Sequence, residues 1–438
     1  MKKTVAGGTT MGLGAIAGCA GDSGSTSNGG GGGGNDGGGG GGGGGSSGSS
    51  LTSMGSIANL KNSYWLSWKK GYEEAAKALG YEVNVQTNDG QVSKQQQQFD
   101  TAVANNTDAI VGQTYTNAAA ISLAETCVEA GVPTVLAVTI AKWYTPMDAG
   151  EEYVQFFTPH FVRHAYTAAK VLFEEMGGEG GFVHIEGNRG TAPNIGRNIG
   201  VQKALEEYPD IELLGPRLQG NWVRSDSRKA MSDLISKHGD KIQGFFGQND
   251  AVAIGGLKML EENGFDVPVV GIDSSEPGLQ MIDEGRMTGS VSGMGPWQGG
   301  WSMAKVHDWR NGHKLSDAER MMSFNAPLTV KDPGKWRDMI GDQTALPIVD
   351  AAQYNEDIFS GETPYDWKKM SVAESGEDAW DPQIQMEPIR EADLKGLMDW
   401  NESNKPSGYS LPDVFGDSGA MDDVASTYDS HFQNNPLK

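Results

Sequence analysis

Residues 241–292 read KIQGFFGQNDAVAIGGLKMLEENGFDVPVVGIDSSEPGLQMIDEGRMTGSVS, and this stretch decides the fold. Its short apolar runs, bounded by Gly and Pro, are typical of buried parallel strands, and the longer segments between them carry helical spacing. The pattern predicts strands over 242–246, 267–272 and 288–292, with helices over 251–262 and 277–284. Alternation of this kind predicts a sheet covered by helices.

Two polar residues interrupt the apolar pattern where predicted strands end. Asn249 closely follows the first strand, and Asp273 directly follows the run VVGI. In open α/β sheets, ligands bind outside the carboxyl ends of the strands. We therefore expect Asn249 and Asp273 to face one cleft.

The runs FFGQNDAVAIGGLKML and VVGIDSSEPGLQMIDEG resemble the second lobe of the sugar-binding proteins of ABC importers, the ribose-binding-protein family. In that family an Asn after one strand and an Asp after the next bind sugar hydroxyls, which implies this role for Asn249 and Asp273. The resemblance covers about residues 51–312. It implies an α/β fold of two Rossmann-like lobes with parallel sheets joined by a multi-strand hinge, the type I periplasmic binding protein fold, plus a C-terminal extension.

The expected domain boundaries follow from where strand and helix alternate. We expect a first lobe from residues 51–150 and 293–325, and a second lobe from residues 151–292. Residues 326–438 form the extension, which lacks the alternation and is rich in Trp, Asp and Pro.

The extension has two candidate forms. It either wraps over both lobes as an extended arm or forms a helical cap over residues 390–401. In both forms we expect its tryptophans to anchor it rather than to bind ligand, namely Trp367, Trp380 and Trp400.

The 438 residues carry a formal net charge of -23, from 57 acidic and 34 basic side chains. An acidic surface repels phosphate backbones, so we expect no nucleic-acid partner. The acidity suits simple solubility or adaptation to high salt, and both interpretations stay open. The chain has 2 cysteines, Cys19 and Cys127, so a lipidated Cys19 leaves Cys127 without a disulfide partner.

Residues 1–19 begin with a basic pair, continue through a Gly- and Ala-rich run and end in the tetrad IAGC. The segment is too short and too rich in Gly to span a bilayer, which suits a cleavable secretory signal. The tetrad resembles the lipobox of exported lipoproteins, which implies lipidation of Cys19 and anchoring at the outer face of the cytoplasmic membrane. Residues 20–50 are almost entirely small and polar, which predicts a disordered tether.

The loop after the first predicted strand reads NLKNSYW over residues 59–65. The order of Asn, small residue and two aromatics resembles the opening of the sugar-binding family, which implies that Asn62 binds a hydroxyl while Tyr64 and Trp65 stack on the sugar. The physics is independent of the family. A sugar has C–H-rich faces that pack on aromatic planes, and its rim of hydroxyls needs donors and acceptors.

Two residues of the second lobe complete the predicted site. The run GNRGTAPNIGRNIG resembles a family segment whose Arg corresponds to Arg197. A guanidinium can bridge two adjacent hydroxyls, and each charged hydrogen bond contributes roughly 1.5–3 kcal/mol. Trp222 stands where the family places an aromatic over the other sugar face, which implies an aromatic sandwich with Trp65.

The chain departs from the family pattern in two places. After the fourth strand the family has an acid and an Arg, whereas this chain has VTI over residues 138–140 and then Trp143, so we expect Trp143 to close over a bulkier or less polar ligand. At the second crossing between the lobes the family carries a Gln. Its place is taken here by Gly293 or Met294, with Gln298 as a substitute candidate.

Other chemistries lack their motifs. His160 and His164 are four residues apart, but HFVRH has no Glu of a zinc protease motif. Nucleophile elbow, phosphate loop and CxxC motifs are missing, and spacing singles out no carboxylate pair. We therefore expect no enzymatic activity and neither a metal nor a cofactor.

Together these patterns predict an extracytoplasmic lipoprotein that captures a sugar or polyol by hinge closure and delivers it to an ABC permease. Its expected partners are this small ligand, the permease and, through the lipid anchor, the membrane. Two alternatives remain, namely a sugar-sensing receptor for a signalling partner and a surface-anchored carbohydrate-active enzyme.

Overall fold

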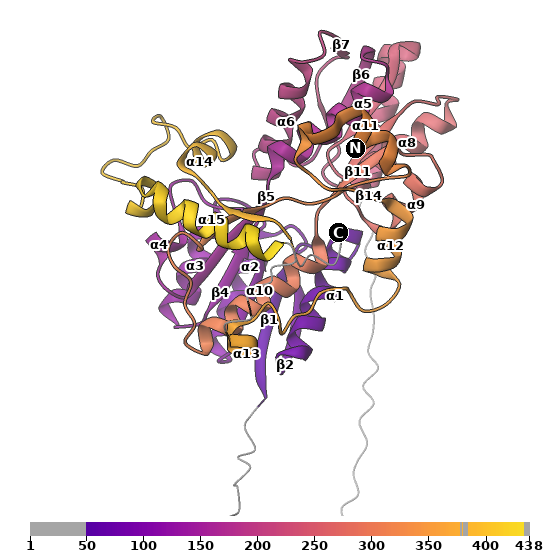
Figure 1. Ribbon diagram of the computed structural model, residues 1–438. Coiled ribbons are helices and arrows are strands. Elements are labelled where there is room, and N and C mark those ends of the chain that lie inside the picture. Colours follow the sequence, from indigo (N-terminus) through magenta and orange to yellow (C-terminus); the bar gives the residue numbers. More distant parts are fainter. Residues whose placement is uncertain (1–49, 377–378, 380–383, 433–438) are drawn as a thin grey trace, which may run out of the picture. The chain divides into compact units, whose positions relative to one another are not determined.

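The computed structural model describes residues 50–376, 379 and 384–432. The predicted signal sequence, Cys19, the tether up to residue 49 and Trp380 lie outside the described residues. Two mixed, mostly parallel sheets organise the described part, and we call the elements around them the first lobe and the second lobe (Figure 1).

The first lobe is built on a sheet with the strand order β15-β12-β5-β4-β3-β1-β2. Its strands are β1 (Leu51–Ile57), β2 (Tyr81–Thr87), β3 (Ala109–Gln113), β4 (Thr134–Ala137), β5 (Tyr153–Pro159), β12 (Met321–Phe324) and β15 (Met386–Pro388). The helices of this lobe are α1 (Ser63–Ala78), α2 (Val92–Ala104), α3 (Ala119–Glu129), α4 (Pro146–Ala149) and α10 (Gly295–Arg310).

The second lobe is built on a sheet with the strand order β14-β13-β11-β10-β9-β6-β7, and β8 pairs with β6 outside this path. Its strands are β6 (Glu179–Glu186), β7 (Asp210–Leu213), β8 (Leu218–Gln219), β9 (Ile242–Gly247), β10 (Val269–Asp273), β11 (Gly289–Ser292), β13 (Leu328–Val330) and β14 (Ile348–Asp350). The helices are α5 (Phe161–Glu175), α6 (Ala192–Leu205), α7 (Arg224–His238), α8 (Asp250–Glu262) and α9 (Glu276–Asp283).

The stretch 241–292 folds as its pattern predicts, with every element within two residues of its expected bounds. Phe246, Val270 and Ile272 are completely or almost completely buried, and burial of each such side chain stabilises the fold by about 1.5–3 kcal/mol. β10 pairs in parallel with both β9 and β11. The carboxyl ends of these strands therefore meet at one edge of the sheet, where Asn249 and Asp273 lie.

The chain enters the second lobe later than the sequence predicts. The expected boundary is residue 151, but β5 pairs with β4 and β12 in the first sheet. The crossing therefore lies between Pro159 and the start of α5 at Phe161. The return crossing runs through Gly293 and Met294, between β11 and α10, and a third crossing links β12 to β13.

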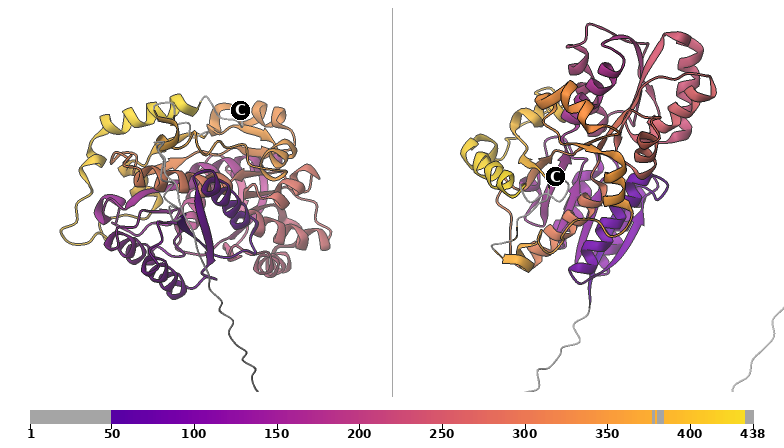
Figure 2. Two further views of the ribbon diagram at one scale, coloured as in Figure 1. Left: turned by 90° about the horizontal axis from the view of Figure 1, so that it is seen from below. Right: turned by 45° about the vertical axis from the view of Figure 1, so that its right-hand side comes forward.

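The extension contributes strands to both lobes, as β13 and β14 join the second sheet and β15 joins the first. Figure 2 shows it, in orange to yellow, along one side of both lobes. Its helices are α11 (Pro333–Ile340), α12 (Ala351–Phe359), α13 (Val372–Ser375), α14 (Glu391–Leu397) and α15 (Ser418–Phe432). Trp367 and Trp400 are 6% and 1% exposed, as expected for anchoring side chains.

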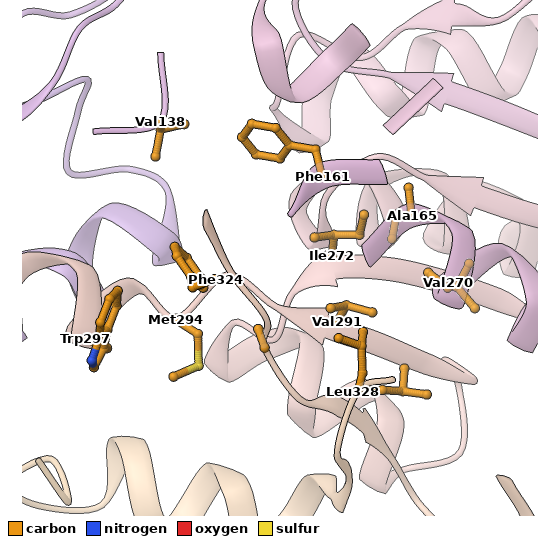
Figure 3. Close-up of a cluster of buried hydrophobic side chains, with 14 of the residues drawn as sticks. Val138, Phe161, Ala165, Val270, Ile272, Val291, Met294, Trp297, Phe324 and Leu328 are labelled. Atoms are coloured by element: carbon orange, nitrogen blue, oxygen red, sulfur yellow. The ribbon is translucent and has the colours of Figure 1, made fainter. Parts of the chain in front are cut away.

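Apolar side chains fill the region where the chain crosses between the lobes (Figure 3). The Trp297 ring lies 5.2 Å from the ring of Phe324 and 5.6 Å from that of Phe157, and Met294 is 1% exposed. This packing buries side chains at and next to the crossings. None of the described helices combines the length and apolar character that crossing a membrane requires.

Candidate ligand-binding cleft

A cleft of about 390 Å³ is lined by residues of both lobes, at the carboxyl ends of their strands. This volume lies within the range of roughly 300–1,000 Å³ that is usual for small-molecule sites. All predicted ligand contacts except Trp143 line it, namely Asn62, Tyr64, Trp65, Arg197, Trp222, Asn249 and Asp273. The structure therefore brings together residues that lie up to 211 positions apart in the chain (273 − 62).

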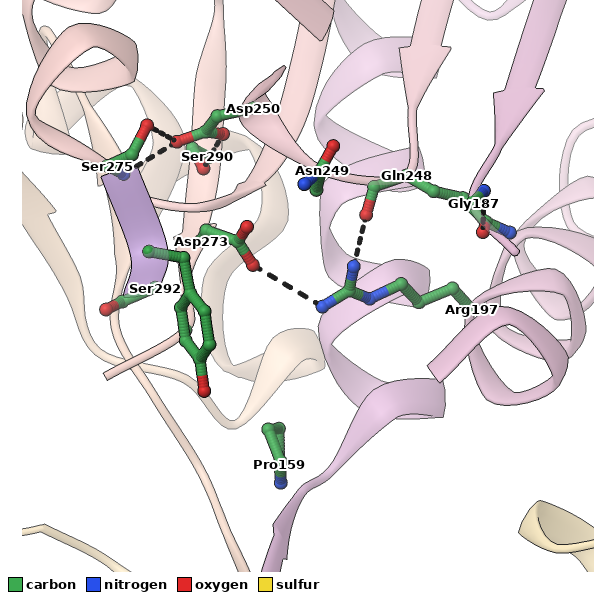
Figure 4. Close-up of polar contacts among 12 residues, drawn as sticks. Pro159, Gly187, Arg197, Gln248, Asn249, Asp250, Asp273, Ser275, Ser290 and Ser292 are labelled. Atoms are coloured by element: carbon green, nitrogen blue, oxygen red, sulfur yellow. Dashed lines mark hydrogen bonds and ion pairs between the residues drawn. The ribbon is translucent and has the colours of Figure 1, made fainter. Parts of the chain in front are cut away.

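Arg197 and Asp273 form the charged part of the second-lobe wall (Figure 4). Arg197 is 6% exposed; its Nη1 donates to the carbonyl oxygen of Gln248, and its Nη2 lies 3.6 Å from Asp273 Oδ1. Burial raises the pKa of Asp273 to about 7; Arg197 opposes this rise and the neighbouring Asp250 adds to it. At neutral pH this wall of the cleft therefore holds one permanent cation, Arg197, and one carboxyl group that is close to its titration point, Asp273.

Asp250 supports this wall from behind the cleft. Its carboxylate accepts hydrogen bonds from the Ser290 hydroxyl (2.6 Å), from the backbone N–H of Ser275 (2.7 Å) and from the Ser275 hydroxyl (2.9 Å). Burial raises its pKa to about 6, although these bonds oppose the rise. Because its oxygens are used within the protein, Asp250 holds neighbouring loops in place rather than facing a ligand.

Asn62 and Asn249 each begin a helix and face the cleft. Asn62 Oδ1 accepts from the backbone N–H of Tyr64 at 2.9 Å, and Asn249 Oδ1 accepts from that of Val252 at 2.9 Å. These are N-cap bonds of α1 and α8. Each side-chain oxygen thus accepts the bond that caps its helix. The amide nitrogen of Asn62 can donate to a ligand, whereas the side chain of Asn249 also hydrogen-bonds Asp273.

Aromatic rings stand on both sides of the cleft. Tyr64 and Trp65 pack edge to face with their centroids 5.1 Å apart on the first lobe. On the second lobe, Trp222 lies against Gly187, where an added Cβ would meet its ring carbons at 2.1 Å. The Arg197 guanidinium is 5.3 Å from the Trp222 ring centroid, so the charged and aromatic parts of this wall are in contact.

Strained backbone is concentrated around the cleft. Among the described residues, eleven non-glycine residues have positive φ, and five of these line the cleft: Asp89, Val138, Asn221, Trp222 and Asp273. At Val138 (φ 69°) a bond from Thr139 N–H to the Ala137 carbonyl (2.7 Å) closes a three-residue turn. Such conformations cost about 1–3 kcal/mol each and tend to occur at functional sites.

Trp143 does not lie in the cleft, so the structure corrects its predicted position. Its ring packs against Trp400 (5.0 Å) and Tyr409 (5.7 Å), and its Nε1 donates to Asn404 Oδ1 at 2.6 Å. The reason is that residues of the extension cover it and leave it 5% exposed. Val138 and Thr139 line the cleft on this side.

The second crossing places Gly293 and Gln298 at the cleft, while Met294 is not among the lining residues. Sequence reasoning missed further polar lining residues, among them Asn88, Gln113 and Thr139 near the ends of strands. Asn88 directly follows β2, Gln113 ends β3, and Thr139 is the second residue after β4. The strand-end rule that singled out Asp273 could have found them too.

Two α/β lobes that enclose an aromatic, hydrogen-bonding cleft define a two-lobed solute-binding protein. Residues 56–314 match the family model described as "Periplasmic binding protein domain", and the chain belongs to this family. The matched relatives include a xylitol-binding protein and a ribose import binding protein, and the matched structures include an ABC transporter solute-binding protein, which confirms the resemblance stated from the sequence.

The xylitol-binding protein of Mycolicibacterium smegmatis is 33% identical over 233 residues, which are 52% of this chain and 64% of that protein. The ribose import binding protein of Bacillus subtilis is 23% identical over 276 residues, or 63% of this chain and 85% of that protein. These relatives are solute-binding proteins, not enzymes. The chain thus covers slightly less than two thirds of the length of the xylitol-binding protein.

The fold is shared with solved structures. The twin-arginine translocation pathway signal protein from Burkholderia phytofirmans superposes with a TM-score of 0.63 and 25% identity, over 68% of this chain and 94% of that one. A periplasmic solute-binding protein from Actinobacillus succinogenes with bound D-allose has a TM-score of 0.59 and 20% identity, over 67% of this chain and 99% of that one.

Proposed function

We propose that this protein captures a sugar or polyol between its two lobes and delivers it to an ABC importer. The observation that carries the proposal is a cleft with aromatic rings on both walls, Trp65 on one and Trp222 on the other. Hydroxyl partners also come from both lobes, with Asn62 on the first and Arg197 and Asp273 on the second. No bond of the ligand is made or broken in this process.

A ligand that touches both lobes stabilises the closed state relative to the open state, because it makes its full set of contacts only there. The Arg197 guanidinium supplies the strongest of these contacts, since each charged hydrogen bond contributes about 1.5–3 kcal/mol. The ring faces of Trp65 and Trp222 exclude water from the C–H faces of the sugar.

The relatives support the ligand class, as their names include xylitol-binding and ribose import proteins. Delivery to an ABC permease is the corresponding proposal for the partner. The N-terminal sequence supports export and anchoring through a lipid on Cys19, with residues 20–50 as the tether. Replacing Cys19 by Ser is expected to move the protein from the membrane fraction of expressing cells to the soluble fraction.

Calorimetric titration of the full chain with xylitol, D-ribose, D-allose and myo-inositol tests the ligand class. A bound ligand at a hundredfold excess over its Kd stabilises the folded state by about 2.7 kcal/mol, so a thermal-shift screen identifies it first.

Arg197→Ala and Trp222→Ala are each expected to weaken binding by about tenfold or more without unfolding the protein. Unchanged titration curves for both variants would contradict the assignment of Arg197 and Trp222 to the ligand-binding site. A wild-type chain that binds no pentose, hexose, polyol or nucleoside would overturn the proposed function.

A further inference from the structure

A row of side-chain hydrogen bonds connects the second lobe crossing to the first-lobe wall of the cleft. Gln298, on α10, is fully buried, and its Nε2 donates to the carbonyl oxygen of Gly293 at 2.6 Å. Gln113, at the end of β3, donates from its own Nε2 to Gln298 Oε1 at 3.3 Å and to the Tyr64 hydroxyl oxygen at 2.6 Å. Three side chains and one backbone carbonyl thus form a continuous relay.

The direction of every bond in this relay is dictated by its first member. A backbone carbonyl can only accept, so the amide nitrogen of Gln298 must face Gly293 and its amide oxygen must face Gln113. That oxygen in turn requires the amide nitrogen of Gln113, which is the atom that also reaches Tyr64. The Tyr64 hydroxyl oxygen is therefore an acceptor in this relay.

The phenolic proton of Tyr64 has no acceptor within this relay. A phenol has one proton to donate, and Gln113 does not take it because its nitrogen is itself the donor. Within the described part of the chain, no hydrogen bond uses this proton. Burial raises the pKa of the Tyr64 phenol, and the nearby Asp273 carboxylate raises it further against the lowering effect of Gln113, so the phenol keeps its proton at neutral pH.

We infer that Tyr64 recognises the ligand by donating its phenolic proton to a ligand oxygen, and that Gln113 and Gln298 are positioning residues that direct this proton to the cleft. The inference rests on the proposed function, since it needs a ligand against the Tyr64 wall. It assigns to Tyr64 a role beyond that of a stacking ring. The ligand must present an acceptor oxygen at this wall, and an analogue with a methyl group or hydrogen at that place binds less tightly.

The first test is Tyr64→Phe, which removes the hydroxyl and keeps the ring. The Kd of the best-binding probe among xylitol, myo-inositol, D-ribose and D-allose is expected to rise about three- to tenfold, as for loss of one neutral hydrogen bond. Xylitol and myo-inositol offer only hydroxyl oxygens, whereas D-ribose and D-allose also offer a ring oxygen. A loss of affinity for xylitol or myo-inositol therefore identifies a hydroxyl oxygen as the acceptor in that complex. An unchanged Kd overturns the inference.

The second test is Gln113→Glu, which keeps the shape of the side chain and exchanges its donor for an acid. Above the pKa of the new carboxyl group, the carboxylate accepts the phenolic proton and withdraws it from the ligand, so binding weakens at least as much as in Tyr64→Phe. Below that pKa, the acid has one proton and can donate it to the Tyr64 oxygen, which accepts the shorter of the two Gln113 bonds. The ratio of variant to wild-type Kd then returns towards one. A ratio that is the same at pH 4 and pH 8 contradicts the relay.

The double variant separates positioning from a general structural effect. In the Tyr64→Phe background, Gln113→Glu is expected to add less than about twofold, because the proton that it redirects is gone. Gln97→Glu, which adds the same charge at an exposed position of α2, serves as the control with unchanged Kd. An equal loss from Gln113→Glu in both backgrounds refutes the positioning role. Failure of the wild-type chain to bind any probe would instead refute the proposed function, and the inference with it.

Discussion

Gly187 offers a way to move Trp222 without touching either the ligand or the indole itself. It follows β6, its φ lies outside the left-handed region, and its N–H donates to Gln248 Oε1 at 2.8 Å. In Gly187→Ala the new Cβ would lie 2.1 Å from ring carbons of Trp222, whereas ordinary contact begins at 3.4 Å. The ring must therefore move by at least about 1.3 Å (3.4 − 2.1).

This displacement removes the stacking surface and disturbs the 5.3 Å contact between the Trp222 ring and the Arg197 guanidinium. A well-placed aromatic contact contributes about 0.5–1.5 kcal/mol, so the Kd of the bound sugar should rise roughly 2- to 12-fold. Isothermal titration calorimetry measures the Kd, and denaturant unfolding shows whether the variant stays folded. Because Trp222 is only half-buried, its ring has room to move, and we expect the free energy of unfolding to fall by less than about 1 kcal/mol.

The control is Gly361→Ala, whose added Cβ meets nothing within 4 Å and should leave the Kd unchanged. A double-mutant cycle then asks whether Gly187 acts through the indole. If it does, Gly187→Ala has little further effect once Trp222 has been replaced by Ala, because the displaced ring is absent. Full additivity of the two changes, or an unchanged Kd in Gly187→Ala alone, would refute the reasoning.

Two further predictions concern Asp273 and Trp143. The pKa of Asp273 is raised from 3.8 to about 7, so between these values the folded protein holds a proton that the unfolded chain has released, and the stability of the ligand-free protein should fall as the pH rises from 4 to 7. The free energy of unfolding should fall by up to about 4 kcal/mol over this pH range. Urea unfolding of Asp273→Asn at each pH should show a weaker dependence of this free energy on pH. The same pH dependence in the variant and the wild-type protein would contradict the prediction. Trp143→Ala should lower the free energy of unfolding by about 3–5 kcal/mol, while the Kd for the ligand stays within twofold of the wild-type value. A tenfold rise of the Kd at unchanged stability would show instead that Trp143 contacts the ligand.

Local sequence patterns predict most of the fold and many residues of the candidate site. Strand and helix periodicities are properties of neighbouring residues, so the elements of 241–292 could be predicted within two residues. Polar residues at strand ends, such as Asp273, could be placed at a common edge because parallel strands in one sheet end there. Asn88 and Gln113 obey the same rule and line the cleft, although the family resemblance does not point to them.

The sequence alone therefore determined the alternating α/β lobes and the residues at their strand ends. The tertiary structure decided which distant segments meet. Trp143 is covered through a bond to Asn404, 261 residues later, and Gln113 bonds Gln298 across 185 residues. The extension joins both sheets with strands of only three residues, which are too short to show a period. Such contacts depend on the path of the whole chain, whereas propensity and periodicity report only on residues within a few positions of one another.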